Sequence, residues 1–213
     1  MSNLGVLLGG RAVNAPLSLI HIWMATHLLG SYSFGLVAMM YAFARTMGDI
    51  VDFQSWQTVL HYGLRPLTQG DRRGFQKIVS FSLLLDSFGG LLGFGGGVLI
   101  SLLAMNLLGW PPEIHVIGVV YCISILFMAS ATATGLLRVF DRYDLLAVQG
   151  TVATIVRVIG TASMALGWAS VTALASVWMA AEVTAWSTIF FMAAREMYRR
   201  DLIRGLFHEM RGI

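Results

Sequence analysis

The sequence predicts an all-α, polytopic integral membrane protein, and three observations lead to this fold class. Apolar residues make up 57% of the 213 residues and charged residues only 12%, whereas soluble domains carry about 25% charged residues. The mean hydropathy is +0.74, and long uncharged apolar runs are typical of helices that cross a bilayer. Almost all Lys and Arg residues lie on one side of these runs, as in membrane proteins with cationic cytoplasmic loops.

Six apolar segments are each long enough to cross about 30 Å of hydrocarbon as an α-helix. We expect them at residues 12–29, 34–62, 78–108, 114–137, 145–167 and 168–194, forming one six-span lobe over residues 1–194. The second and third exceed the length that a crossing needs, so we expect them to tilt or to extend into the cytoplasm. No basic region precedes a short apolar core at the start, so we expect no cleaved signal peptide.

The segments differ in the side chains that they offer for packing. Pro16 lies early in the first segment and predicts a kink or a helix start there. The third segment repeats the GxxxG spacing at Gly89, Gly93 and Gly97, which lets a neighbouring backbone approach closely. The polar side chains of the fourth are hydroxyls, namely Ser124, Ser130, Thr132 and Thr134.

The last residues, 195–213, form a basic tail with the sequence REMYRRDLIRGLFHEMRGI. Helical spacing places Tyr198, Leu202, Leu206 and Met210 near one face and arginines on the others. This pattern predicts an interfacial helix on the anionic lipids of the inner membrane, or the start of a linker to a further lobe. A cationic stop-transfer cluster without another role is the alternative.

The cations outside the segments set the expected orientation. They are Arg11; Arg65, Arg72, Arg73 and Lys77; Arg138 and Arg142; and Arg195, Arg199, Arg200, Arg204 and Arg211. The connections on the opposite side, GSYS, LGWPPE and LGW, contain no cation. We therefore expect both termini and the basic loops in the cytoplasm.

Ionisable residues also occur inside the expected segments. They are His21 in the first, Arg45, Asp49 and Asp52 in the second, Asp86 in the third, Arg157 in the fifth and Glu182 in the sixth. A charge that faces lipid at mid-bilayer costs about 3 kcal/mol even on the most lenient scale, so these groups should face the bundle interior or a hydrated cavity. Residues 45, 49, 52 and 56 share one helix face, which would form a wall of that cavity.

Four acids stand against two arginines in these segments, so at least one acid should be protonated or bind a cation. The coupling candidates for H⁺ or Na⁺ are Asp49, Asp52, Asp86, Glu182 and His21. A purely structural role is the alternative for each of these residues. Arg45 could neutralise Asp49 four residues later, and Arg157 could pair with Glu182 between two helices.

Little in the sequence points to an enzyme. Cys122 is the single cysteine, so we expect neither a disulfide nor a cysteine-based metal site. We expect no cofactor, no catalytic residue and no nucleic-acid partner. The best candidate cluster for a membrane enzyme is Arg138, Asp141, Arg142 and Asp144. Two acids give few oxygen ligands for the metal that phosphoryl transfer requires, so a salt-bridged loop at the membrane boundary is the better reading.

Two stretches resemble a known family: DFQSWQTVLHYG at 52–63, and GLLRVFDRYDLLA with the following VRVIG at 135–147 and 156–160. The opening GRAVNAPLSLIHIWMATHLLGSYSFGL is similar in character to the first span of that family. The family is the bacterial polysaccharide or O-antigen flippases, within the multidrug/oligosaccharidyl-lipid/polysaccharide exporter superfamily. The resemblance runs through the whole chain, and its motifs contain no catalytic signature.

The resemblance implies transport of an undecaprenyl-pyrophosphate-linked oligosaccharide from the cytoplasmic to the periplasmic leaflet of the bacterial inner membrane. It implies alternating access driven by a cation gradient, with Arg45 and Arg157 as cavity cations for the anionic head group. Such transporters have twelve to fourteen spans in two lobes. We therefore expect this chain to be the N-terminal lobe, working with a second six-span lobe or as a homodimer.

Two further readings remain open at this stage. A multidrug or cation antiporter of the same superfamily would use the excess of acids to bind cationic drugs. A non-transporting, truncated membrane protein is the other possibility, because six spans are half of the family's usual number.

Overall fold

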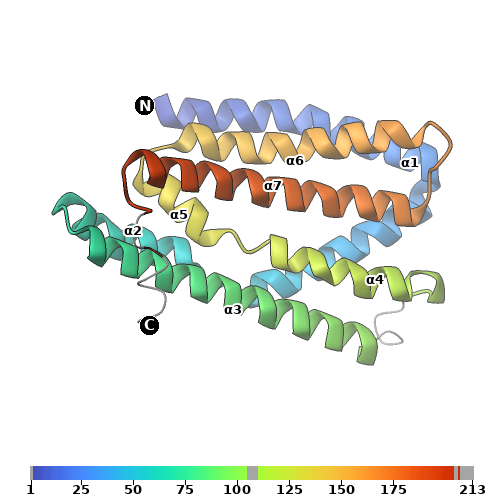
Figure 1. Cartoon of the computed structure of the whole chain (residues 1–213). Coiled ribbons are helices and arrows are strands. Elements are labelled where there is room, and N and C mark those ends of the chain that lie inside the picture. The colour runs from blue at the N-terminus through green and yellow to red at the C-terminus, as the bar shows by residue number, and fades with distance from the viewer. Residues whose placement is uncertain (1, 105–109, 204–205, 207–213) are drawn as a thin grey trace.

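The computed structural model describes residues 2–104, 110–203 and 206, and side chains from Asn14 onward within these ranges. Every regular element in the described part of the chain is helical (Figure 1). The elements are α1 (Ser2–Ile50), α2 (Ser55–Thr68), α3 (Arg72–Ala104), η1 (Pro112–Ile114), α4 (His115–Tyr121), η2 (Cys122–Phe127), α5 (Ala131–Val139), α6 (Tyr143–Met164) and α7 (Val171–Arg199).

Five of the described helical stretches are long and apolar enough to cross a membrane. They are Asn14–Ile50, Arg72–Leu103, Pro112–Val139, Tyr143–Met164 and Val171–Arg199. The first contains both of the first two predicted segments, and Gly30 interrupts it with φ 79° and ψ 158°. Only glycine adopts such a conformation without strain. Beyond this point α1 turns back, so that its first part lies along α6 and its second part runs towards α3 (Figure 1).

The prediction of one helix over residues 34–62 is wrong, because α1 ends at Ile50 and α2 begins at Ser55. Asp52 Oδ1 accepts a hydrogen bond of 2.8 Å from the backbone N–H of Gln54, and Gln54 has a left-handed backbone with φ 50°. A short acidic side chain that bonds the backbone two residues later competes with the helical pattern. This local bond opens the helix at residues 51–54.

The prediction of one helix over residues 114–137 is also wrong. The backbone passes from α4 through η2 and a non-helical stretch at 128–130 into α5. Side chains of other helices satisfy the opened backbone: Trp186 Nε1 donates to the carbonyl of Ala129 at 3.1 Å, and Asp86 Oδ2 accepts from the N–H of Thr132 at 2.7 Å. Within a membrane, irregular backbone needs partners of this kind. The remaining predicted segments agree with α3, α6 and α7 to within a few residues at most described ends.

The predicted close approach at the glycine repeat is confirmed. A methyl group on Gly89 would lie 2.7 Å from the carbonyl oxygen of Val51, and one on Gly97 would lie 2.8 Å from the Ile125 side chain. Gly93 faces both of those residues at 3.0 Å or less. The stripe therefore seats α3 against the helix break at 51–54 and against η2.

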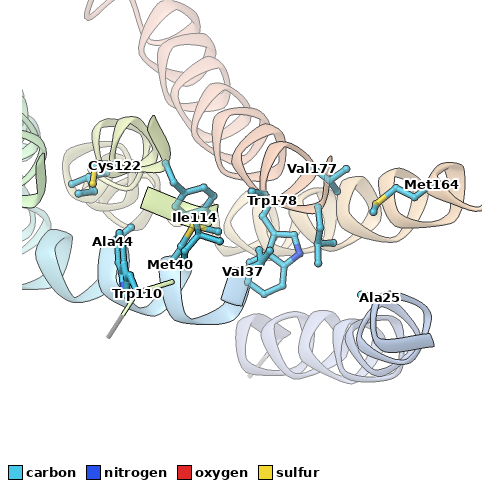
Figure 2. Close-up of a cluster of buried hydrophobic side chains, with 14 residues drawn as sticks. Ala25, Val37, Met40, Ala44, Trp110, Ile114, Cys122, Met164, Val177 and Trp178 are labelled. Carbon is cyan, nitrogen blue, oxygen red and sulfur yellow. The ribbon is translucent and has the colours of Figure 1, made fainter. Parts of the chain in front are cut away.

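Buried apolar side chains form two clusters. One joins α1, α4, η2 and α7, and Figure 2 shows Trp178 of α7 reaching towards Val37 of α1 within it. The other joins α2, α3, α5 and α7 around Phe75, Leu137 and Ile189. The ionisable residues of the expected segments lie where these two clusters meet or within the first cluster.

Of the predicted tail, the structure describes residues 195–203 and 206. Helix α7 continues to Arg199 and ends there, and Asp201 turns the chain with φ 58°. Leu202 and Leu206 are buried in the second cluster, and Gln76 Nε2 donates to the Leu202 carbonyl at 2.7 Å. Met210 lies outside the described residues. Of the predicted apolar face, Leu202 and Leu206 therefore pack on the protein, whereas Tyr198 is exposed.

Candidate functional site

A polar cavity of about 410 Å³ lies where the two helix breaks meet. Residues 51–53 and 128–130 both contribute to its wall. Its polar side chains are Arg45, Asp49, Asp52, Trp56, Asp86, Ser130, Thr134, Arg138 and Gln149. They come from five helices (α1, α2, α3, α5 and α6) and from the two breaks, which converge on one space. Non-helical backbone that lines a cavity at membrane depth is the usual setting of a binding site in transporters.

The predicted ionic face forms one wall of this cavity. Arg45 Nε lies 3.2 Å from Asp49 Oδ1, and the two side chains are 53% and 60% exposed. Asp52, beyond the end of α1, also lines the wall, although it no longer belongs to the helix. The pair is therefore open towards the cavity rather than sealed between helices.

Arg138 is the second arginine that lines the cavity, a position that the residue pattern alone did not predict. Its guanidinium carbon lies 4.2 Å from the centre of the Trp56 ring, a cation–π contact. Gly135, one turn earlier, makes this contact possible, because a methyl group there would lie 2.9 Å from the Cα of Trp56. The cation distribution predicts Arg138 at the cytoplasmic side, and the structure places it near the end of α5 on the cavity wall. Gly135 is the local sequence feature that permits its contact with Trp56.

Asp86 is only 8% exposed and holds the first turn of α5 through its bond to Thr132 N. A carboxylate at a helix N-terminus also interacts favourably with the helix dipole. The hydroxyls of Ser55 and Thr132 are buried beside the Asp86 carboxylate. Asp52 and Asp86 are the two cavity acids that form no ion pair in the described part of the chain.

The other three predicted site residues lie elsewhere. Arg157 on α6 forms a 2.6 Å ion pair with Glu182 on α7, with side chains 22% and 14% exposed. The Trp178 ring stacks over the same guanidinium with its centre 4.9 Å away, and His21 Nδ1 lies 3.0 Å from the hydroxyl of Thr161. The expectation of one site shared by both arginines is thus corrected, because Arg157, Glu182 and His21 do not line the cavity.

The candidate enzyme cluster separates into structural contacts. Arg142 binds Asp144 at 2.9 Å and also pairs with Glu196 of α7. These two carboxylates, Asp144 foremost, raise the pKa of Arg142 above its ordinary value. Among the described residues no group of three His, Cys, Asp or Glu side chains could hold a metal ion. Arg142 therefore ties the start of α6 to the end of α7.

The cavity can act in two chemical ways. Arg45 and Arg138 offer planar guanidinium groups to an anion, and arginine is suited to phosphate oxygens. Asp52 and Asp86 offer carboxylate oxygens to a proton or a hard cation. Both sets face the same space.

Comparison with known proteins gives one informative likeness. No protein-family model and no solved structure matches the chain. Over 151 residues, 71% of the chain, it is 33% identical to the "Inner membrane protein YghQ" of Escherichia coli (strain K12). The chain spans less than half the length of this curated relative, since the match covers 42% of it. Together with the five apolar helices, the likeness identifies a polytopic helical membrane protein.

Proposed function

We propose that the chain is one six-span lobe of a bacterial inner-membrane transporter that moves undecaprenyl-pyrophosphate-linked oligosaccharides from the cytoplasmic to the periplasmic leaflet. The single observation that carries the proposal is the polar cavity at the two helix breaks, which Arg45 and Arg138 both line. The likeness to an inner membrane protein supports the location.

The kink at Gly30 supports six crossings rather than five. The stretch Asn14–Ile50 has 37 residues, which at 1.5 Å per residue is about 55 Å of helix, nearly twice the hydrocarbon thickness. The turn divides it into two crossings. An even number of crossings returns the C-terminus to the side of the N-terminus, and the distribution of Lys and Arg favours the cytoplasm for both.

The head group of the substrate would bind between Arg45 and Arg138. A cavity of about 410 Å³ suits a pyrophosphate and its first sugar but not a whole glycan with its lipid. The rest of the substrate would extend towards a facing wall, supplied by a second lobe or by a second copy of this chain. In this scheme Arg157 is structural and does not touch substrate.

The coupling cation, H⁺ or Na⁺, would bind at Asp52 and Asp86. Asp49 is neutralised by Arg45 and Glu182 by Arg157, which leaves the other two acids for this role. Of the original coupling candidates, the proposal retains Asp52 and Asp86 and gives Asp49, Glu182 and His21 supporting positions.

Ligand binding by the purified chain tests the head-group assignment. Undecaprenyl pyrophosphate should raise the thermal stability of the protein, and the Arg45→Gln/Arg138→Gln variant should bind it at least tenfold more weakly. Arg73→Gln removes an exposed charge outside the cavity and serves as the matched control. Equal binding by all three proteins, or equal binding of uncharged undecaprenol, would overturn the proposal. Loss of polysaccharide export with Arg45→Ala in a complementation assay would then connect binding to transport.

A cation antiporter is the second candidate, and the unpaired acids Asp52 and Asp86 favour it. The same assay separates the two functions. If a lipophilic cation such as ethidium binds, and Asp52→Asn/Asp86→Asn abolishes that binding while the arginine variant does not, the cavity serves cations rather than pyrophosphates.

A further inference from the structure

A second concavity lies between α2 and α3, separate from the polar cavity. This α2–α3 groove has a volume of about 720 Å³ and shares no lining residue with the cavity. Its wall combines basic side chains with apolar and aromatic ones: His61, Tyr62 and Arg65 from α2, and Lys77, Ile78 and Phe81 from α3. None of its lining residues is acidic.

The spacing on each helix accounts for the composition of the groove. Residues three or four apart lie on one helix face, so His61 and Arg65 follow each other along α2, as Lys77 and Phe81 do along α3. The two helices are antiparallel and are joined by the short turn at 69–71. Arg65 and Lys77 therefore lie near the turn, while Phe81 lies about one helical turn further from it.

Close packing at the base of the groove leaves its outer side open. A methyl group on Gly63 would lie 3.1 Å from the Phe75 ring, so α2 and α3 approach closely there. On the outer side Tyr62 is 68% exposed and Phe81 48% exposed. Arg65 forms no ion pair among the described residues. An apolar channel thus runs along the helices from a basic end.

We propose that the α2–α3 groove binds an anionic glycerophospholipid of the cytoplasmic leaflet. The phosphate lies at Arg65, beside His61, and an acyl chain runs along Tyr62, Ile78 and Phe81. Charge complementarity carries the assignment, because a basic groove without acidic lining residues, between α2 and the candidate membrane helix α3, matches an anionic head group. The apolar channel requires a ligand with a hydrocarbon chain. This site is independent of the proposed transport function.

Native mass spectrometry of the full chain in detergent tests the lipid site. Phosphatidylglycerol should bind more tightly than phosphatidylcholine of the same chain length. Arg65→Gln should weaken phosphatidylglycerol binding about fivefold, the effect of one cation near an anionic lipid, and Arg65→Lys should retain most of it. Arg73→Gln, which removes a charge from the first turn of α3 outside the groove, should change nothing.

Two results would overturn this site: equal retention of phosphatidylglycerol by the Arg65→Gln and Arg73→Gln variants, or equal binding of the zwitterionic lipid. Tyr62→Ala/Phe81→Ala tests the acyl channel and should weaken long-chain but not short-chain phosphatidylglycerol. The cavity variant Arg45→Gln/Arg138→Gln should bind phosphatidylglycerol as the unmodified protein does. The lipid-site result can therefore be interpreted even if the transport proposal fails. Thermal unfolding of each variant confirms that it is folded.

Discussion

Two arginine–carboxylate pairs in this protein have the same chemistry and opposite surroundings. Arg45 and Asp49 lie on the wall of a cavity with more than half of each side chain exposed. Arg157 and Glu182 lie between α6 and α7, largely covered, with the rings of Tyr41 and Trp178 within 5.1 Å of the guanidinium. In the proposed function the first pair exchanges its partner for a ligand, whereas the second keeps its ion pair, although the Arg157 Nε is buried without a hydrogen-bond partner among the described residues. Burial, rather than residue type, distinguishes the pair in the proposed binding site from the covered pair.

The largest expected effect is on the covered pair. Glu182→Ala leaves the Arg157 charge without its partner in a poorly hydrated place, which should lower the free energy of unfolding by about 3–5 kcal/mol. Unfolding in mixed detergent and sodium dodecyl sulfate, followed by circular dichroism, measures it.

The double variant Arg157→Met/Glu182→Leu removes both charges and should recover most of that loss, because apolar residues of similar volume often replace a buried pair without cost. It should also bind undecaprenyl pyrophosphate normally. If the double variant is stable but does not bind the ligand, Arg157 belongs to the substrate site. The two pairs would then not differ in function.

An intermediate effect is expected at Asp86, which belongs to the cavity but is buried. Asp86→Ala removes the acceptor for the Thr132 N–H at the start of α5, and the loss of such a cap costs about 1–2 kcal/mol. Asp86→Asn keeps an acceptor oxygen and should lose less than half as much.

Comparing the two Asp86 variants separates a structural role of this carboxylate from a role in cation coupling. If Asp86→Asn is stable yet transport in proteoliposomes no longer responds to a pH or Na⁺ gradient, the carboxylate binds the cation. Normal coupling in Asp86→Asn would leave Asp86 as a helix cap alone.

The sequence could predict the class of fold, because composition and cation distribution determine it without any detail of packing. It could also predict the contact of Gly89, Gly93 and Gly97, since small residues at GxxxG spacing have one main use. It could not predict the helix breaks at 51–54 and 128–130. Neither stretch contains glycine or proline. At 128–130 the side chains that satisfy the opened backbone, Trp186 and Asp86, come from distant helices.

The residues of the candidate site also differ in how far the sequence predicts their positions. Arg45, Asp49 and Asp52 could be placed together because helical spacing is a local property. Arg138 could not, because its position depends on how closely α5 approaches Trp56, and that distance is a tertiary quantity. Likewise, the sequence showed that Leu202 and Leu206 share a face but not whether lipid or protein would cover it.

The smallest expected effect on stability is at the exposed pair, Arg45 and Asp49. This prediction is the most direct test of the difference between the two arginine–carboxylate pairs. Arg45→Gln or Asp49→Asn should change the free energy of unfolding by less than about 1 kcal/mol, since exposed ion pairs contribute little. The exchange Arg45→Asp/Asp49→Arg should be at least as stable as the unmodified protein, because an acid that precedes its cation by four residues suits the helix dipole better. Restored stability together with restored binding of undecaprenyl pyrophosphate would show that the pair only neutralises itself. We expect the exchanged variant to be stable but to bind the ligand at least tenfold more weakly. The ligand needs a guanidinium at position 45, and the exchange moves it one helical turn away, to position 49.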